Sequence, residues 1–349
     1  MVETTAEAVR EALEYGRVRK VLAVRASRLG DLLFTTPALA AFRARWPEVE
    51  VLLLGNRYSA PLLERDPAVD RIILTASKEA ALAGDADLVR RLRHEAPALL
   101  LALRPRVEHG RLAEAAGIPF LFPEGRREDD RRDRHVVEQC FDRLAPLGLE
   151  GRPGPMRVVL GEDELAAVAP LLPPGEGPLV HVHPGCDETI RWKPRRGVRR
   201  RVWPPDHWAE LLRLLHGGGA RLVVSSGSAL EGRWVERILA ASGVPARHLA
   251  RLPLRQLAAV AARADLVVSV DTGPLHVAAA VGTPQVALYG PSPVAYTGPW
   301  GGRATVLRRD LPCAPCQGRS VRCLQNVCML ELGPAEVLDA ARARIAGPS

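Results

Sequence analysis

The chain has 349 residues, 47% of them apolar, and a formal net charge of +8. It is too long for one typical hydrophobic core, and its length predicts two domains. No run reaches the roughly 18 apolar residues that a membrane-spanning helix needs, and the polar start MVETTAEAVREALEYGRVRK is typical neither of a signal peptide nor of a membrane anchor. We therefore expect a cytoplasmic globular protein whose basic charge suits phosphates, anionic lipid or nucleic acid.

The first half of the chain alternates strand-like and helix-like segments. The pattern predicts strands over 21–25, 50–54, 71–74, 99–103 and 118–122. It predicts helices over 31–45, 58–64, 108–116 and 135–147. A segment rich in Gly and Pro, 148–155, indicates a boundary, so we expect a first domain over residues 1–155.

The second half, 156–333, repeats this scheme. We predict strands over 179–183, 221–225, 265–270 and 285–288. We predict helices over 161–172, 206–216, 230–240, 254–263 and 275–281, with a terminal helix over 334–345. We expect the last segment, 334–349, to pack back on the first domain. Alternating β and α in both halves predicts two doubly wound, Rossmann-like α/β domains that face each other across a cleft.

The segment 264–291 carries the clearest signal of a site, because it predicts a strand, a turn, a short helix and a second strand. Thr272 is the expected N-cap of the helix, Pro274 suits its first turn, and Gly282 suits the left-handed position after its end. Free backbone N–H groups at this helix start favour a phosphate, to which His276 can add a donor. The alternative is an ordinary capped helix in an α/β core.

Polar residues also follow three other predicted strands. Asp31 stands at a helix start after the first strand, where its carboxylate would repel a phosphate, so it suits a general base better. The alternative is that Asp31 only complements the helix dipole. In the second half, His183 and Gly185 form a tight turn at a strand end. Gly227 and Glu231 follow the next strand, where an acid can hold ribose hydroxyls or simply occupy a helix first turn.

Four motifs in chain order resemble glycosyltransferase family 9, the ADP-heptose:lipopolysaccharide heptosyltransferases. They are VLAVRASRLGDLLFTTPAL, VHVHPG followed by RVWPPDHWAELL, VVSSGSALE, and VVSVDTGPLHVAAAVGTPQVALYGP. The resemblance implies a GT-B fold and inverting transfer of a sugar from a nucleotide diphosphate sugar, without a metal or other cofactor. It implies ADP-heptose as donor and an anionic glycolipid such as lipopolysaccharide core as acceptor, with peripheral contact at the cytoplasmic face of the inner membrane.

The resemblance also implies roles for single residues. Asp31 matches the proposed general base, and Arg28, Gly30 and Arg57 are acceptor-binding candidates in the same domain. The implied donor-binding residues are His183, Gly185, Arg201, Gly227, Glu231, Asp271, Thr272, Gly273, Pro274 and His276. Within this set Glu231 would bind ribose, and the turn 272–273 with the following helix start would hold the diphosphate.

Seven basic residues and no acidic residue occur from Arg191 to Arg201. This link is longer than the usual one in the family, so Arg199 or Arg200 could occupy the position that we assign to Arg201. The loop is either a clamp that holds donor phosphates or an anionic acceptor molecule, or it is a solvated segment without a binding role. We do not expect nucleic acid as a partner, because no nucleic-acid-binding motif accompanies the charges.

Four of the six cysteines, Cys313, Cys316, Cys323 and Cys328, lie close together near the end of the chain. In a cytoplasmic protein this favours a metal or redox cluster over a disulfide framework. Only the first pair has the close spacing of a zinc site, so a structural metal cluster and plain structural thiols both stay open.

Two other functions remain compatible with the sequence. A nucleotide-sugar epimerase on the same fold would convert the donor without an acceptor. A non-catalytic nucleotide-sugar-binding module would bind the donor and transfer nothing. Asp31 beside the predicted cleft argues against the second, because binding alone does not need a base.

Overall fold

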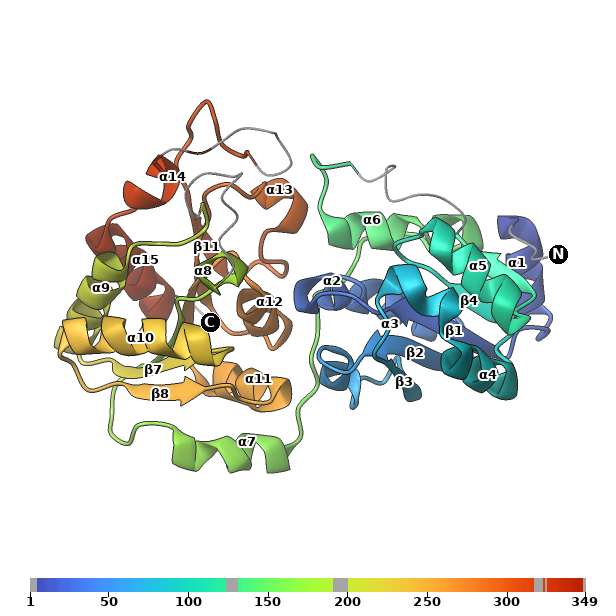
Figure 1. Ribbon diagram of the computed structural model, residues 1–349, viewed down its shortest axis with the longest axis horizontal. Helices are drawn as coiled ribbons and strands as arrows, with labels where there is room; N and C mark the ends of the chain where they lie inside the picture. Colours follow the sequence, from blue (N-terminus) through green and yellow to red (C-terminus); the bar gives the residue numbers. More distant parts are fainter. Residues whose placement is uncertain (1–4, 124–130, 191–199, 317–322, 324, 348–349) are drawn as a thin grey trace. The chain divides into compact units, whose positions relative to one another are not determined.

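The computed structural model describes residues 5–123, 131–190, 200–316, 323 and 325–347. The chain divides into two compact units, Met1–Val159 and Leu160–Ser349, and each is α/β (Figure 1). The division falls after Val159 rather than after residue 155 because Arg157 is bound within the first unit. Its backbone N–H donates to Thr36 Oγ1 at 3.1 Å, and its guanidinium donates to the buried carboxylate of Asp66 at 2.6 Å.

The described residues of the first unit form a five-stranded parallel sheet in the order β3-β2-β1-β4-β5. The strands are β1 (Lys20–Arg25), β2 (Glu50–Asn56), β3 (Arg71–Thr75), β4 (Leu99–Leu101) and β5 (Phe120–Phe122). The α-helices are α1 (Ala6–Glu14), α2 (Leu29–Leu33), α3 (Thr36–Arg45), α4 (Ala86–Glu95), α5 (Val107–Ala116) and α6 (Val136–Asp142). Short 3-10 helices are η1 (Ala60–Leu63), η2 (Glu79–Gly84) and η4 (Ala145–Leu147). The strand order reverses between β1 and β4, which is where open α/β sheets bind ligands.

The helix expected over 31–45 is two helices, α2 and α3, which is a correction. Pro37 lies in the first turn of α3 and has no N–H to offer to the carbonyl of Leu33, four residues earlier. The hydroxyl of Thr36 donates to that carbonyl at 2.8 Å, and the hydroxyl of Thr35 donates to Leu32 O at 2.6 Å. These two side chains satisfy the backbone at the break, so α2 stays short and ends close to Asp31.

The described residues of the second unit form a six-stranded parallel sheet in the order β11-β10-β9-β6-β7-β8. The strands are β6 (Leu179–His183), β7 (Arg221–Ser226), β8 (Arg247–Ala250), β9 (Leu266–Val270), β10 (Gln285–Leu288) and β11 (Ala304–Leu307). The helices are α7 (Glu162–Val168), η5 (Ala169–Leu171), α8 (Asp187–Ile190), α9 (Pro205–Gly217), α10 (Ala229–Ser242), α11 (Leu254–Arg263), α12 (Gly273–Ala280), α13 (Val294–Thr297), α14 (Val327–Leu330) and α15 (Pro334–Ala346). Here the order reverses between β6 and β9. No helix in the described ranges is both long and apolar enough to cross a bilayer.

The terminal helix α15 belongs to the second unit, where it lies beside α9, β9 and β10 (Figure 1). Its buried residues Val337, Leu338 and Ala341 join the core that contains Trp203 and Met329. The segment is therefore part of the second unit's core, and its packing back on the first domain stays a prediction. Helices α1 and α4 and strands β8 and β11 were not predicted from the sequence.

Candidate functional site

In the first unit, Asp31 lies in the first turn of α2, directly after β1. Arg25, the last residue of β1, is buried and holds it in two ways. Its Nη2 lies 3.2 Å from Asp31 Oδ1, and its Nε donates to the Asp31 carbonyl at 3.1 Å. The hydroxyl of Ser27 donates to Oδ2 at 3.3 Å. The Asp31 side chain is still 29% exposed, so this carboxylate is both held in place and accessible.

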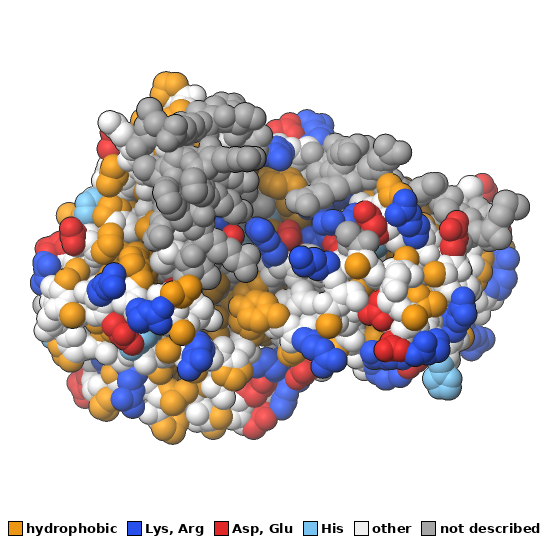
Figure 2. Space-filling model, in the orientation of Figure 1, with side chains coloured by type: hydrophobic (Ala, Val, Ile, Leu, Met, Phe, Trp, Pro, Cys, Tyr) orange, Lys and Arg blue, Asp and Glu red, His pale blue; other side chains and the backbone are white. Residues whose placement is uncertain are grey.

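The loop that carries Asp31 is also fixed by the neighbouring strand. Asn56, at the end of β2, donates through Nδ2 to the carbonyl of Ser27 at 2.5 Å. Arg57 is exposed directly after Asn56, and Arg28 is exposed at the N-cap of α2, where Gly30 is buried. The structure therefore places the acceptor-binding candidates at the carboxyl ends of the adjacent strands β1 and β2. On the face shown in Figure 2, Lys and Arg side chains are scattered among Asp and Glu, so the net charge marks no single patch there.

Behind Arg25 lies a buried charge cluster that sequence reasoning missed. Glu79 Oε1 is 3.0 Å from His109 Nε2 and 3.9 Å from Arg25 Nη1, and Glu79 Oε2 is 3.1 Å from Arg106 Nε. Burial alone would raise the pKa of Glu79, but the His109 hydrogen bond and the charges of Arg25 and Arg106 outweigh it and lower this pKa. Glu79 is therefore an anion inside the unit. Because Arg106 follows β4 and Arg25 ends β1, the cluster stands where the strand order reverses.

In the second unit, the turn between β9 and α12 has the predicted form. Thr272 occupies the N-cap position with extended backbone, but its side chain makes no capping hydrogen bond. Pro274 stands in the first turn, which contains no acidic residue. Gly282 has φ +80°, and hydrogen bonds from its N–H to Ala279 O and from Thr283 N–H to Ala278 O end the helix. An anion at this helix start would meet backbone N–H groups and no carboxylate from that turn.

Arg201 reaches the same turn. Its Nη1 donates to the carbonyl of Asp271 at 3.3 Å and lies 3.7 Å from Asp271 Oδ2, while Glu188 Oε2 accepts from its backbone N–H at 3.1 Å. Burial alone would lower the pKa of Arg201, but the charge of Asp271 and of neighbouring groups raises it. Ser292 donates its hydroxyl to Asp271, and His276 Nε2 lies 4.0 Å from Asp271 Oδ1. Asp271 thus holds Arg201 and His276 in place, and its carboxylate charge is balanced by Arg201.

Three arginines, Arg199, Arg200 and Arg201, were candidates for the position beside the donor diphosphate. Among the described residues, it is Arg201 that lies close to Asp271. Arg200 is buried, and its Nη1 lies 3.6 Å from the thiol of Cys316 instead. Arg199 and the rest of the basic segment 191–199 lie outside the described residues.

At the end of β6, His183 is buried and shares the hydroxyl of Ser225 with His181. The distances to Ser225 Oγ are 2.8 Å from His183 Nδ1 and 2.7 Å from His181 Nε2. Burial lowers the pKa of His183 to about 4, and burial together with the charge of His183 lowers the pKa of His181 to about 3. Both rings are therefore neutral at neutral pH, and a hydroxyl that donates to one and accepts from the other suits that state.

Glu231 connects the ends of β6 and β7. Its backbone N–H donates to the Ser228 hydroxyl at 3.1 Å, and its carboxylate accepts from the Gly227 N–H. Burial raises the pKa of Glu231, although the Gly227 hydrogen bond opposes this. Gly185 lies directly against the carboxylate, so that a Cβ at this position would overlap it. The structure thus brings the predicted residues Gly185, Gly227 and Glu231 together.

The four late cysteines are free thiols, and three of them lie near enough to the fourth, Cys328, to act on its charge. Burial raises the pKa of Cys328 to about 11, and the charges of Cys316, Cys323 and Cys313 contribute to the shift. Within the described residues, however, no three His, Cys, Asp or Glu side chains are arranged to hold a metal ion. A metal cluster at these cysteines stays a prediction.

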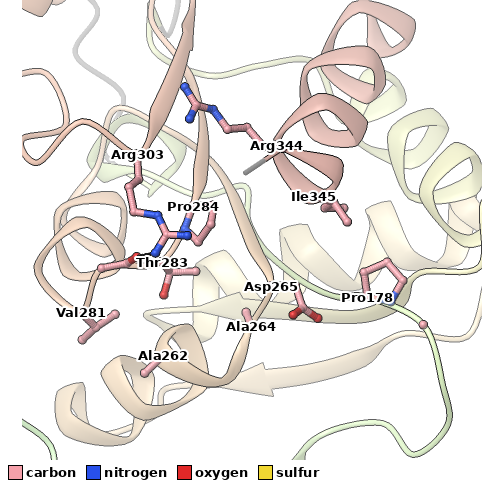
Figure 3. A pocket seen from close by; sticks show the side chains of 13 residues that line it. Pro178, Ala262, Ala264, Asp265, Val281, Thr283, Pro284, Arg303, Arg344 and Ile345 are labelled. Atoms are coloured by element: carbon pink, nitrogen blue, oxygen red, sulfur yellow. Dashed lines mark hydrogen bonds between the residues drawn. The ribbon is translucent and has the colours of Figure 1, made fainter. Parts of the chain in front are cut away.

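A pocket of about 660 Å³ lies elsewhere in the second unit, between strands and the end of α15 (Figure 3). Asp265, Pro284 and Arg303 line it, and they precede β9, β10 and β11. The pocket is therefore at the amino edge of the sheet, opposite to the motif residues. Parallel sheets bind ligands at the carboxyl edge, so we do not assign it to the site.

The chain is similar to known proteins over most of its length. Residues 94–325 match the family model described as glycosyltransferase family 9 (heptosyltransferase). The chain is 33% identical over 160 residues to lipopolysaccharide heptosyltransferase 1 of Pseudomonas aeruginosa, a match that covers 42% of this chain and 45% of that protein. It is 27% identical over 314 residues to lipopolysaccharide heptosyltransferase 1 of Escherichia coli K12, covering 83% and 93%. The solved structure of E. coli ADP-heptose lps heptosyltransferase II superposes with a TM-score of 0.75 at 23% identity, covering 93% of this chain and 98% of that one.

Proposed function

Because the chain belongs to glycosyltransferase family 9, the heptosyltransferases, we propose that it transfers heptose from ADP-heptose to a hydroxyl of an anionic glycolipid such as lipopolysaccharide core. The family and the GT-B fold that the sequence predicted are confirmed. The observation that carries the proposal is the placement of the motif residues. In both sheets they lie at the carboxyl edge, at the strands where the order reverses or at a strand next to these.

The second unit is proposed to bind the donor. The diphosphate would accept hydrogen bonds from the backbone N–H groups at the start of α12, and Arg201 would add a positive charge beside it. Glu231 would hold the ribose hydroxyls. His183 and Gly185 line the same edge, and neither adds a charge that would repel a phosphate.

The first unit is proposed to supply the base. The acceptor hydroxyl oxygen would attack the anomeric carbon from the side opposite to the diphosphate, and Asp31 would take the hydroxyl proton. The bond from the anomeric carbon to the diphosphate oxygen breaks, and the nucleotide leaves with the electron pair. A single displacement inverts the anomeric configuration. The helix start of α12 and Arg201 would stabilise the leaving charge, so the proposal includes no metal.

The acceptor proposal rests on the family and on two exposed arginines of the first unit. The relatives in Pseudomonas aeruginosa and Escherichia coli are named lipopolysaccharide heptosyltransferases. Arg28 and Arg57 are exposed beside Asp31 and could contact the anionic groups of such an acceptor. An acceptor of this kind would bring the enzyme to the cytoplasmic face of the inner membrane.

The central experiment compares Asp31→Asn with Asp87→Asn. Both residues stand in the first turn of a helix in the first unit, and Asp87 is a surface residue of α4. We expect Asp31→Asn to lower kcat by about 10²–10⁴-fold, with ADP-heptose binding by calorimetry unchanged. Asp87→Asn should keep wild-type turnover. If the two variants behave alike, Asp31 only complements the helix dipole and the proposed base is wrong.

The same assay separates the other functions. ADP-heptose incubated alone should stay unchanged, because conversion without an acceptor would indicate an epimerase. NMR of the product should show the anomeric configuration inverted. Donor binding without transfer to any anionic glycolipid would indicate a binding module. A thermal-shift screen of nucleotide diphosphate sugars identifies the donor, since a ligand at 100 times its Kd adds about 2.7 kcal/mol of stability.

A further inference from the structure

Arg25 is placed to act on the base rather than on a substrate. It ends β1 with a side chain that is 4% exposed, so it cannot present its charge to a bulky ligand. Three groups surround its guanidinium: the Asp31 carboxylate at 3.2 Å, the Asp31 carbonyl at 3.1 Å and the Glu79 carboxylate at 3.9 Å. The side chain and the backbone of one catalytic residue are thus bound by one planar cation.

Glu79 fixes the far side of this cation. Its Oε1 is hydrogen-bonded to His109 Nε2 at 3.0 Å, its Oε2 lies within ion-pair distance of Arg106 Nε at 3.1 Å, and its side chain is 5% exposed. His109 is buried on α5, and Glu79 begins η2 after β3. The cluster therefore joins elements from both sides of the strand-order reversal, and its charges are paired, as buried charges must be.

We propose that Arg25, held by Glu79, is a positioning residue that fixes the Asp31 carboxylate as an accessible anion aimed out of the β1–α2 loop. This inference rests on the proposed function of Asp31 as the base. Two properties of the guanidinium matter. Its charge favours the ionised form of the Asp31 carboxylate. Its planar fork of N–H donors binds the carboxylate and the carbonyl of Asp31 at the same time, which fixes the direction of the side chain. Ser27, on Oδ2, restricts the remaining rotation.

The competing explanation is that Arg25 only stabilises the fold. Removing it would then lower stability and the fraction of active enzyme, but each active molecule would keep wild-type catalysis. A positioning role predicts changes in the chemistry itself. The test therefore measures kcat per donor-binding site, the Kd of ADP-heptose by calorimetry, and the pH dependence of kcat/KM for the acceptor.

For Arg25→Met we expect kcat per site to fall by about tenfold or more, with ADP-heptose binding unchanged. The acidic limb of the pH profile should move to higher pH, because the carboxylate loses its neighbouring cation. Arg25→Lys keeps the charge without the fork, so its acidic limb should stay in place while kcat is intermediate. Arg71→Met is the matched control, since Arg71 pairs with Glu50 and Glu95 at the other end of the same sheet.

A wild-type kcat per site in Arg25→Met, or a reduced kcat with the wild-type acidic limb, would overturn the inference. If Arg25→Met does not fold, Arg25→Lys decides, and wild-type kcat in that variant would show that the fork is not needed. Failure of this inference differs from failure of the proposed function. If Asp31→Asn keeps its activity, the proposal that Asp31 is the base is wrong. If Asp31→Asn is inactive but the Arg25 variants are fully active, only the positioning role of Arg25 is wrong.

Discussion

The buried histidine pair of the second unit should make this protein sensitive to mild acid. His181 and His183 have an ordinary pKa of 6.5 when unfolded, but their pKa values fall to about 3 and about 4 in the folded protein. As the pH drops below 6.5, the unfolded chain binds protons that the folded protein does not. Stability is therefore complete above pH 6.5 and is lost as the pH falls toward 4 and 3.

The size of the effect follows from the two pKa values of each ring. Between pH 8 and pH 5 each histidine removes about 2 kcal/mol from the free energy of unfolding, so the pair removes about 4 kcal/mol. That is a large part of the roughly 5–15 kcal/mol by which folded proteins are stable. The second unit should thus lose much of its stability at a pH where carboxylates are still mostly ionised.

Variants that keep the Ser225 hydrogen bonds but do not titrate test this directly. The variants are His181→Gln, whose amide can replace Nε2, and His183→Asn, whose amide can replace Nδ1. Urea unfolding at pH 8 and pH 5 should show the pH-dependent loss reduced by about 2 kcal/mol in each single variant and about 4 kcal/mol in the double variant. His216→Gln, on the surface of α9, is the matched control. If the double variant is as acid-sensitive as the wild type, the reasoning about buried neutral rings is wrong.

Three other outcomes are expected. Gly185→Ala should displace the Glu231 carboxylate, lower the free energy of unfolding by about 1.5–3 kcal/mol and weaken ADP-heptose binding. In a Glu231→Ala background it should cost much less, and additive effects in this cycle would contradict the predicted overlap. Arg157→Met should leave the buried Asp66 carboxylate without its guanidinium and cost about 2–3 kcal/mol in urea unfolding, whereas Arg131→Met, at an exposed pair, should leave the urea midpoint nearly unchanged. Dialysis against EDTA should leave transferase activity unchanged, and a loss that Zn²⁺ or Fe²⁺ restores would contradict metal-independent transfer.

The sequence predicted all five strands of the first sheet and the central strands of the second, but it missed both edge strands of the second sheet. Strands covered by helices on both faces are continuous apolar runs, such as Val51–Leu54, which is fully buried. Strands β8 and β11 lie at an edge of the sheet, are four residues long and are only partly buried, so they carry little hydrophobic pattern. Helix α4 was missed although Asp85 caps it and Leu88 and Leu92 are buried at helical spacing, because its remaining residues are mostly charged.

The candidate site was partly visible in the sequence because its motif residues follow predicted strands directly. Asp31 and Thr272 each stand at the first turn after a strand, where neighbours in the chain define the surroundings. The cluster behind Asp31 has no such local signal. Arg25, Glu79 and His109 come from three separate elements, and only the order of the strands brings them together. A charged residue at the end of the apolar run 21–25 was the one available hint.

The proposed division of labour between the two units rests on charge at two equivalent places. Each sheet reverses its strand order beside its first strand, and a short helix begins near that point in both units. In the first unit the helix start carries Asp31, which an arginine holds from behind. In the second, the first turn of α12 has no acid, and Arg201 stands beside it. A diphosphate would be repelled at the first place and attracted at the second. Because both sheets offer the same geometry, this difference in sign is our reason for proposing the donor site in the second unit and the proton transfer in the first.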